Sequence, residues 1–213
     1  MGLFEDFINF IIHLDQNLAA IIQQFGILTY FILFAIIFAE TGLVITPFLP
    51  GDSLLFLAGT FAAVGLLRIE LLFVILSAAA ILGDTVNYWI GFYTGPKIFR
   101  KKDARFFKKE YLETTKNFYE KYGGKTIVLA RFIPIIRTFA PFIAGIGKMN
   151  YSRFAVYNIS GGIAWVAIFL LGGYFFGNIP IVRENLSTAI ILIILASFFP
   201  VIIRLLLPTR KKK

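Results

Sequence analysis

Long apolar segments constrain this chain most strongly. Residues 154–176 and 190–207 contain one charged residue between them, Arg204, and a helix needs about 20 mostly apolar residues to cross a ~30 Å hydrocarbon core. Residues 69–93 form a third segment of this kind. The whole chain is 58% hydrophobic and 15% charged, whereas soluble domains are about 45–50% apolar and about 25% charged. These observations predict an all-α polytopic membrane protein.

The basic residues are unevenly distributed. Residues 1–67 contain no Lys or Arg, ten of the 21 basic residues fall within residues 97–125, and more close the chain at 210–213. Basic clusters can bind nucleic acid, but clusters that alternate with apolar segments follow the positive-inside rule. We therefore expect no nucleic-acid partner. The loop 96–125 and the tail 208–213 are predicted to be cytoplasmic, with the N-terminus external.

Two apolar segments are interrupted in the middle. Residues 27–67 are broken by Pro47, Pro50 and Gly51, and residues 126–146 by Pro134 and Pro141. The first apolar piece, 27–39, would cover only about 20 Å as a helix, which is too short to cross. Irregular backbone at membrane depth is tolerated only where protein or a watery cavity surrounds it. Both segments are therefore predicted to be re-entrant helical hairpins.

The two predicted hairpins resemble each other. The first contains Phe-Leu-Ala-Gly at 56–59 and the second Phe-Ile-Ala-Gly at 142–145. Matched interrupted segments in two halves are the best sequence indication of a transporter site, and with the charge distribution they predict an inverted repeat. The predicted parts are an amphipathic helix (1–26), a core (27–177) with hairpins 27–67 and 126–146 and spanning helices 69–95 and 154–176, and a C-terminal spanning helix (188–207).

Four charged residues lie inside the interrupted segments: Glu40, Asp52, Arg131 and Arg137. A charge at the bilayer centre costs roughly 2.5–3.5 kcal/mol on insertion scales, so the four are predicted to offset one another. A purely structural set of ion pairs is the alternative. Arginine presents a planar fork that suits phosphate oxygens and stays charged when desolvated. Arg131 and Arg137 are therefore predicted to bind a phosphate group.

The acidic residues have a different predicted role. Glu40 and Asp52 can change protonation state with their surroundings, which makes them candidates for proton coupling along the pathway. Asp84 is a further intramembrane acid, one turn before Asn87, and a pathway role and a structural role are equally compatible with it. Asn87 and Thr138 are predicted to support the site.

Composition also excludes several kinds of chemistry. The chain has no cysteine and one histidine, His13, which argues against disulfides and most zinc sites. No serine nucleophile stands beside a base. We expect no cofactor, no metal site and no enzyme activity.

The interrupted segments resemble a known family. Residues 38–42 (Phe-Ala-Glu-Thr-Gly) with 46–53, and residues 123–125 with 131–141 and 144–145, are similar to the two signatures of the DedA family, whose members carry the VTT domain. The resemblance extends over nearly the whole chain. It implies two facing re-entrant hairpins, an inner-membrane location, and dependence on Glu40, Asp52, Arg131 and Arg137.

The resemblance also implies a function. Family members are linked to recycling of undecaprenyl phosphate and to phosphatidylethanolamine distribution, and related eukaryotic proteins are phospholipid scramblases. The leading hypothesis is a flippase that returns undecaprenyl phosphate to the cytoplasmic leaflet, with proton coupling. The alternatives are a phospholipid flippase or scramblase and a proton-coupled exporter of small cations or drugs. Association of identical chains stays open.

Overall fold

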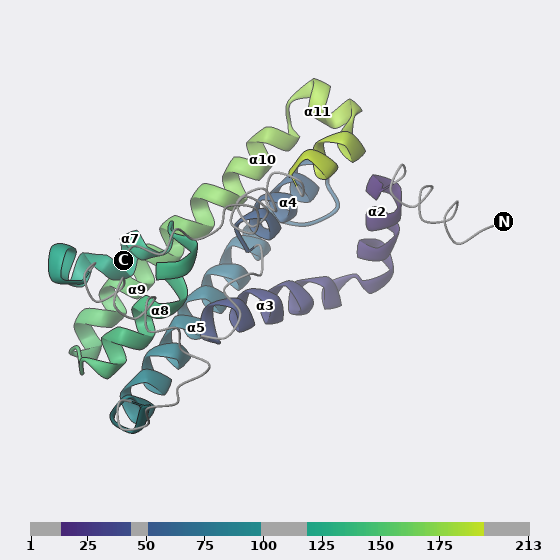
Figure 1. Cartoon of the computed structure of the whole chain (residues 1–213). Helices are drawn as coiled ribbons and strands as arrows, with labels where there is room; N and C mark the ends of the chain where they lie inside the picture. The colour runs from purple at the N-terminus through teal and green to yellow at the C-terminus, as the bar shows by residue number, and fades with distance from the viewer. Residues whose placement is uncertain (1–13, 44–50, 99–118, 194–213) are drawn as a thin grey trace, which may run out of the picture. The chain divides into compact units, whose positions relative to one another are not determined.

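The computed structural model describes residues 14–43, 51–98 and 119–193. Within these ranges the regular structure is helical (Figure 1). The elements are α2 (Leu14–Phe25), α3 (Ile27–Gly42), α4 (Gly51–Ala63), α5 (Ile69–Ile98), η1 (Gly123–Lys125), α7 (Thr126–Ala130), α8 (Pro134–Ile146), α9 (Tyr151–Val166), η2 (Ala167–Leu171), α10 (Gly172–Gly177) and α11 (Pro180–Glu184). Residues 186–193 are also helical.

Some sequence predictions concern residues outside these ranges. They are the first half of the amphipathic helix, Pro47 and Pro50 in the first hairpin, most of the basic loop, and the end of the C-terminal spanning helix with its tail.

Among the described residues, two helices are long and apolar enough to cross a bilayer, as the sequence predicts. They run over Ile69–Thr94 and Tyr151–Gly177. The second consists of α9, a π-helical turn (η2) and α10, which Figure 1 shows as one continuous ribbon. Large apolar side chains project from both, and Val74, Val156 and Phe175 are 64%, 66% and 67% exposed. Exposed apolar side chains on helices of this length and composition suit a lipid environment.

Shorter helices occupy the interrupted segments. α3 continues beyond the apolar piece 27–39, through Glu40 and on to Gly42. Glutamate is a good helix former, so Glu40 does not end the helix. In the second segment α7 ends at Ala130, and α8 begins at Pro134. Proline suits a first helical position, where its missing N–H would have no intrahelical partner.

The chain divides into two units. The first contains the described parts of Met1–Thr29, Asp52–Ile69 and Phe169–Lys213, and the second contains those of Tyr30–Gly51 and Glu70–Ile168.

In the second unit, α8 packs closely against α5 through two glycines. A Cβ atom on Gly91 would lie 2.1 Å from the carbonyl oxygen of Phe142, and one on Gly145 would lie 2.0 Å from that of Tyr88. Backbone atoms cannot yield to such a contact, so these positions require glycine. Small residues allow this close helix approach in membrane proteins.

The first unit repeats this packing between α4 and the end of the second long helix. A Cβ atom on Gly173 would lie 1.9 Å from the carbonyl oxygen of Phe56, and one on Gly59 would lie 2.0 Å from that of Leu170. Gly59 and Gly145 are the last residues of the two matched tetrapeptides. The matched sequences therefore make matched contacts, each against the C-terminal part of a long helix.

Candidate functional site

A buried ion pair joins α3 to α8 in the second unit. The Arg137 guanidinium donates through Nη2 to Oε1 of Glu40. Arg137 is 5% exposed and Glu40 is fully buried. The two residues are far apart in sequence, at the end of α3 and in the first turn of α8. The pair therefore fixes one end of each interrupted segment against the other.

The same carboxylate also holds the start of the helix that follows. The backbone N–H of Gly51, the first residue of α4, donates to Glu40 Oε1 at 3.1 Å. The first N–H groups of a helix have no intrahelical partner and attract negative charge. A Cβ atom at position 51 would lie 1.7 Å from Glu40 Oε2. Glycine at this position therefore lets the carboxylate reach both the guanidinium and the backbone.

A second buried ion pair joins α7 to α5. Arg131, directly after α7, lies with Nη2 at 2.6 Å from Oδ2 of Asp84, and the two side chains are 1% and 2% exposed. The same Nη2 donates to Oδ1 of Asn158, on α9, also at 2.6 Å. The amide of Asn158 is itself held, because its Nδ2 donates to the Ile81 carbonyl at 2.9 Å and to Thr85 Oγ1 at 3.2 Å.

Glycines on α9 make room for Arg131. A Cβ atom on Gly161 would lie 3.3 Å from Arg131 Nε, and one on Gly162 would lie 3.4 Å from Nη2 and 2.9 Å from Ile81 Cγ1. Two successive positions without side chains therefore let the guanidinium lie directly against the helix backbone.

A third buried polar side chain links α3, α5 and α8. The Nδ2 atom of Asn87, on α5, donates to the carbonyl of Thr41 at 3.1 Å and to that of Thr138 at 2.9 Å. Thr41 follows Glu40 in sequence, and Thr138 follows Arg137. Asn87 therefore sets the separation of the two backbones that carry the first ion pair.

An aromatic ring contacts the first ion pair from α9. The Arg137 guanidinium carbon lies 5.1 Å from the ring centroid of Trp165, and Trp165 is fully buried. A cation over an aromatic face at this distance is attracted by the ring quadrupole, by about 2 kcal/mol when desolvated. Arg137 is thus held by a carboxylate and by an aromatic ring.

Several polar atoms of the second pair and its surroundings have no hydrogen-bond partner among the described residues. They are Nε and Nη1 of Arg131, Oδ1 of Asp84 and Oδ1 of Asn87, all buried. Most buried polar atoms in proteins have a partner. The cluster therefore offers unused donors and unused acceptors together, which a ligand with both kinds of group would satisfy.

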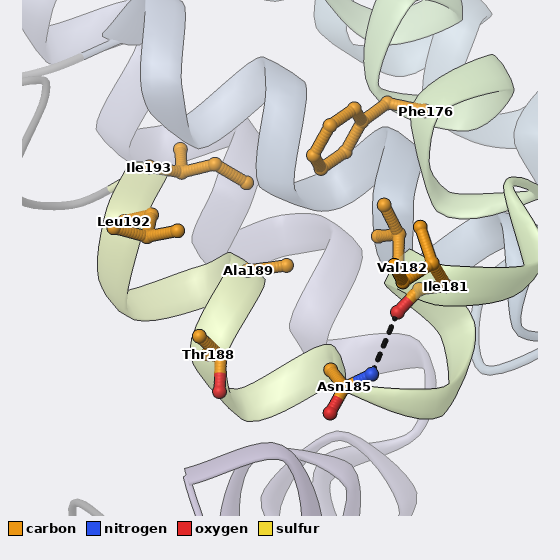
Figure 2. Close-up of a pocket in the computed structure, with 8 residues that line it drawn as sticks. All are labelled: Phe176, Ile181, Val182, Asn185, Thr188, Ala189, Leu192 and Ile193. Carbon is orange, nitrogen blue, oxygen red and sulfur yellow. Dashed lines mark hydrogen bonds between the residues drawn. The ribbon is translucent and has the colours of Figure 1, made fainter.

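A groove of 360 Å³ lies in the first unit (Figure 2). Its lining consists of Phe176, Ile181, Val182, Asn185, Thr188, Ala189, Leu192 and Ile193. The amide of Asn185 donates to the carbonyl of Ile181 at 3.0 Å, the bond drawn dashed in Figure 2. The groove has no charged side chain in its lining, so it is unsuited to a charged group.

Comparison with known proteins identifies the family of this chain. The VTT domain model matches residues 49–175, which include both arginines, Asp84 and Asn158. The chain is 50% identical over 208 residues to Protein DedA of Escherichia coli strain K12, covering 97% of this chain and 95% of that protein. It belongs to the DedA family.

More distant relatives agree with this assignment. The Uncharacterized membrane protein ML0287 of Mycobacterium leprae is 45% identical over 168 residues, which is 79% of this chain and 75% of the relative. The Inner membrane protein YqjA of Escherichia coli strain K12 is 36% identical over 152 residues, which is 71% and 69% of the two chains. Both relatives are named as membrane proteins. No solved structure matches the chain significantly.

In this DedA-family protein, six of the residues singled out from sequence lie in the second unit as buried polar groups. They are Glu40, Asp84, Asn87, Arg131, Arg137 and Thr138. The sequence predicted that Glu40, Asp52 and the two arginines would offset one another, and in the structure Arg137 pairs with Glu40 and Arg131 with Asp84. Thr138 contributes its backbone carbonyl.

The remaining predicted residues that the structure describes lie in α4 and α8. Asp52 is in the first turn of α4, partly buried, and belongs to the first unit. Pro134 begins α8, Pro141 lies inside it, and Gly51 begins α4. Among the residues that the structure describes, no three His, Cys, Asp or Glu side chains form a metal-binding group.

Sequence reasoning gave no role in the site to Asn158 or Trp165. The signal for Asn158 was present, because it is an amide inside the apolar segment 154–176 and polar residues in such segments need partners. The signal for Trp165 was absent, because tryptophan is equally common at membrane interfaces.

Proposed function

We propose that this protein moves a phosphate-bearing lipid between the leaflets of the bacterial cytoplasmic membrane, with undecaprenyl phosphate as the leading cargo. The observation that carries the proposal is the pair of buried arginines on either side of the break between α7 and α8, each with a carboxylate. Arginine–phosphate contacts are frequently bidentate and remain charged in an apolar medium. A lipid phosphate is the anion that such a site meets inside a membrane.

The proposed mechanism is an exchange of anions on arginine. Without lipid, Glu40 holds Arg137 and Asp84 holds Arg131. A phosphate that enters takes the place of a carboxylate, and a carboxylate that takes up a proton loses its charge and yields its arginine more easily. Proton uptake and lipid binding are then linked, so a proton gradient would bias the direction of transport.

The unused groups on Arg131 and its neighbours support a phosphate as the ligand. Nε and Nη1 of Arg131 are donors, and Oδ1 of Asp84 is an acceptor. A phosphate monoester that carries one proton has acceptor oxygens and one O–H donor, so it suits both.

The proposed frame for this exchange is a pair of re-entrant hairpins in inverted orientation, with the C-terminus cytoplasmic and the N-terminus external. The repeated glycine contacts of α4 and α8 support it, and so does the charge asymmetry along the chain. We propose a transporter and not an enzyme, without a cofactor, and leave open whether identical chains associate.

A phospholipid with an amino head group is the second candidate cargo. The acceptor atoms Oδ1 of Asp84 and Oδ1 of Asn87 favour it, because an ammonium group donates to such atoms. A small-cation exporter is less compatible with the site. Glu40 and Asp84 each already have an arginine, so neither offers a net negative charge to a cation.

The test is transport of labelled undecaprenyl phosphate in proteoliposomes. We expect the wild type to move it and the Arg131→Lys/Arg137→Lys double variant, which keeps both charges but loses the planar forks, to be slower by about tenfold or more, equivalent to about 1.4 kcal/mol. A matched control is Arg153→Lys/Arg183→Lys, since both residues are exposed. Equal rates for all three proteins would refute the proposal.

Competition separates the two cargoes. Unlabelled phosphatidylethanolamine in excess should leave transport of labelled undecaprenyl phosphate unchanged if the monoester is the cargo. It should slow that transport if the phospholipid shares the site.

A further inference from the structure

We propose that Asn158 is a positioning residue that presets the guanidinium of Arg131 for the lipid phosphate. The inference rests on the proposed function and adds a residue, with a stated role, to its binding site.

The first step is the set of contacts that Asn158 makes. Its side chain is buried and 1% exposed. Oδ1 accepts from Arg131 Nη2 at 2.6 Å, while Nδ2 donates to the Ile81 carbonyl at 2.9 Å and to Thr85 Oγ1 at 3.2 Å. An amide can be reversed only if its partners tolerate the exchange. Here a reversed amide would face a guanidinium with its own donors, so only one orientation is compatible with the surroundings.

The second step is what this orientation does to Arg131. Nη2 carries two N–H donors, and its acceptors are Asp84 Oδ2 and Asn158 Oδ1, each at 2.6 Å, and the backbone carbonyl of Asn158 at 3.4 Å. Nη2 is therefore saturated. The plane of the guanidinium is fixed by two contacts from different helices, and Nε and Nη1 are left without a described partner. These two donors remain for a phosphate oxygen to accept from.

The third step is that Asp84 alone would not achieve this. A single monodentate contact lets the guanidinium turn about it, and Oδ1 of Asp84 has no described partner. Without Asn158, Arg131 can turn to bind both oxygens of Asp84 in the bidentate geometry that arginine and carboxylates favour. That arrangement would use the donors that a phosphate needs. It would also bind the Asp84 carboxylate, which competes with the phosphate, more tightly to Arg131.

The experiment is saturation kinetics of undecaprenyl phosphate transport in proteoliposomes, with the mole fraction of lipid varied. For Asn158→Ala we expect KM to rise by about tenfold, equivalent to about 1.4 kcal/mol, while kcat changes by less than about twofold. A merely structural role predicts the opposite, namely a lower amount of folded protein and a lower apparent kcat with KM unchanged. The control is Asn178→Ala, since Asn178 is exposed and its amide bonds only within its own helix end, to the Tyr174 carbonyl.

A milder variant keeps the test informative if Asn158→Ala does not fold. Thr85→Val removes one acceptor of the Asn158 amide with almost no change of shape. We expect KM to rise by about two- to threefold, the fold-change of a weak hydrogen bond.

A double-variant cycle shows whether the effect acts through Arg131. If Asn158 works by orienting Arg131, then Asn158→Ala should add little to the KM of Arg131→Lys, because contacting residues are not additive. Unchanged KM in both Asn158→Ala and Thr85→Val, or full additivity with Arg131→Lys, would overturn the inference. A wild type that moves no phosphate lipid would overturn the proposed function instead, so the two failures are distinguishable.

Discussion

The Arg131–Asp84 pair allows folding and function to be separated. We predict that Asp84→Leu, which leaves a buried arginine without its counter-charge, lowers the free energy of unfolding by about 3–5 kcal/mol. Arg131→Met should cost less, about 1–3 kcal/mol, because the remaining carboxyl group can take up a proton and become neutral. The Asp84→Leu/Arg131→Met double variant should return to within about 1–2 kcal/mol of the wild type, since an apolar pair of similar volume needs no counter-charge.

The expected magnitude follows from the geometry. The two charges lie 2.6 Å apart and are 1% and 2% exposed. At an effective dielectric constant of about 20 their attraction is about 6 kcal/mol, and the larger values of a dry interior are upper bounds. Desolvation of both groups offsets much of this attraction. The loss of one partner therefore costs more than the loss of both.

The assay is equilibrium unfolding in mixed micelles, followed by circular dichroism, with the coupling energy taken from the four proteins. We expect about 3 kcal/mol or more of coupling. Arg183→Met and Glu184→Leu form the control pair, because both residues are exposed, and each should lie within about 0.5 kcal/mol of the wild type. If the losses in free energy of unfolding of the two single variants simply added in the double variant, the ion pair would not be the source of the destabilisation. Transport by a stable double variant would refute its role in function.

Three further predictions concern the same unit. Asn87→Leu removes two buried hydrogen bonds and should lower the free energy of unfolding by about 1–3 kcal/mol. Asn178→Leu, at an exposed position, should lie within about 0.5 kcal/mol of the wild type. Thermal melting in detergent would compare them, and equal melting temperatures would contradict a stabilising role of the Asn87 hydrogen bonds. Gly145→Ala should reduce the amount of folded protein, because its Cβ would lie 2.0 Å from a backbone oxygen. Gly172→Ala should not, because its Cβ would lie 3.6 Å from the nearest atom, a ring carbon of Phe56, which is an ordinary van der Waals contact. Size-exclusion yield measures both. Burial raises the pKa of Tyr119, whose phenol donates to a carbonyl at 2.9 Å. The folded protein therefore keeps a proton that the unfolded chain loses near pH 10, so its stability falls as pH rises above that value. Tyr119→Phe should weaken that fall in unfolding measurements at pH 9 and 11, and an identical loss of stability in both proteins would contradict it.

Some helices could be predicted from the sequence in full and others only in part. Helix 69–94 and helix 151–177 were predictable, because uninterrupted apolar length is a local property that needs no knowledge of neighbours. The extension of α3 to Gly42 was not predictable from apolar length, since Glu40 interrupts the apolar run.

The same distinction applies to the residues of the site. The sequence by itself determined that acidic and basic groups would lie within interrupted apolar segments, because such groups are rare there and stand out. Only the tertiary structure decided that Arg131 pairs with Asp84, that Arg137 pairs with Glu40, and that Asn158 holds Arg131. The physical reason is that pairing requires helices to meet within hydrogen-bond distance. Which helices meet depends on contacts such as those of Gly91 with α8 and Gly161 with Arg131, and these join residues that are far apart in the chain.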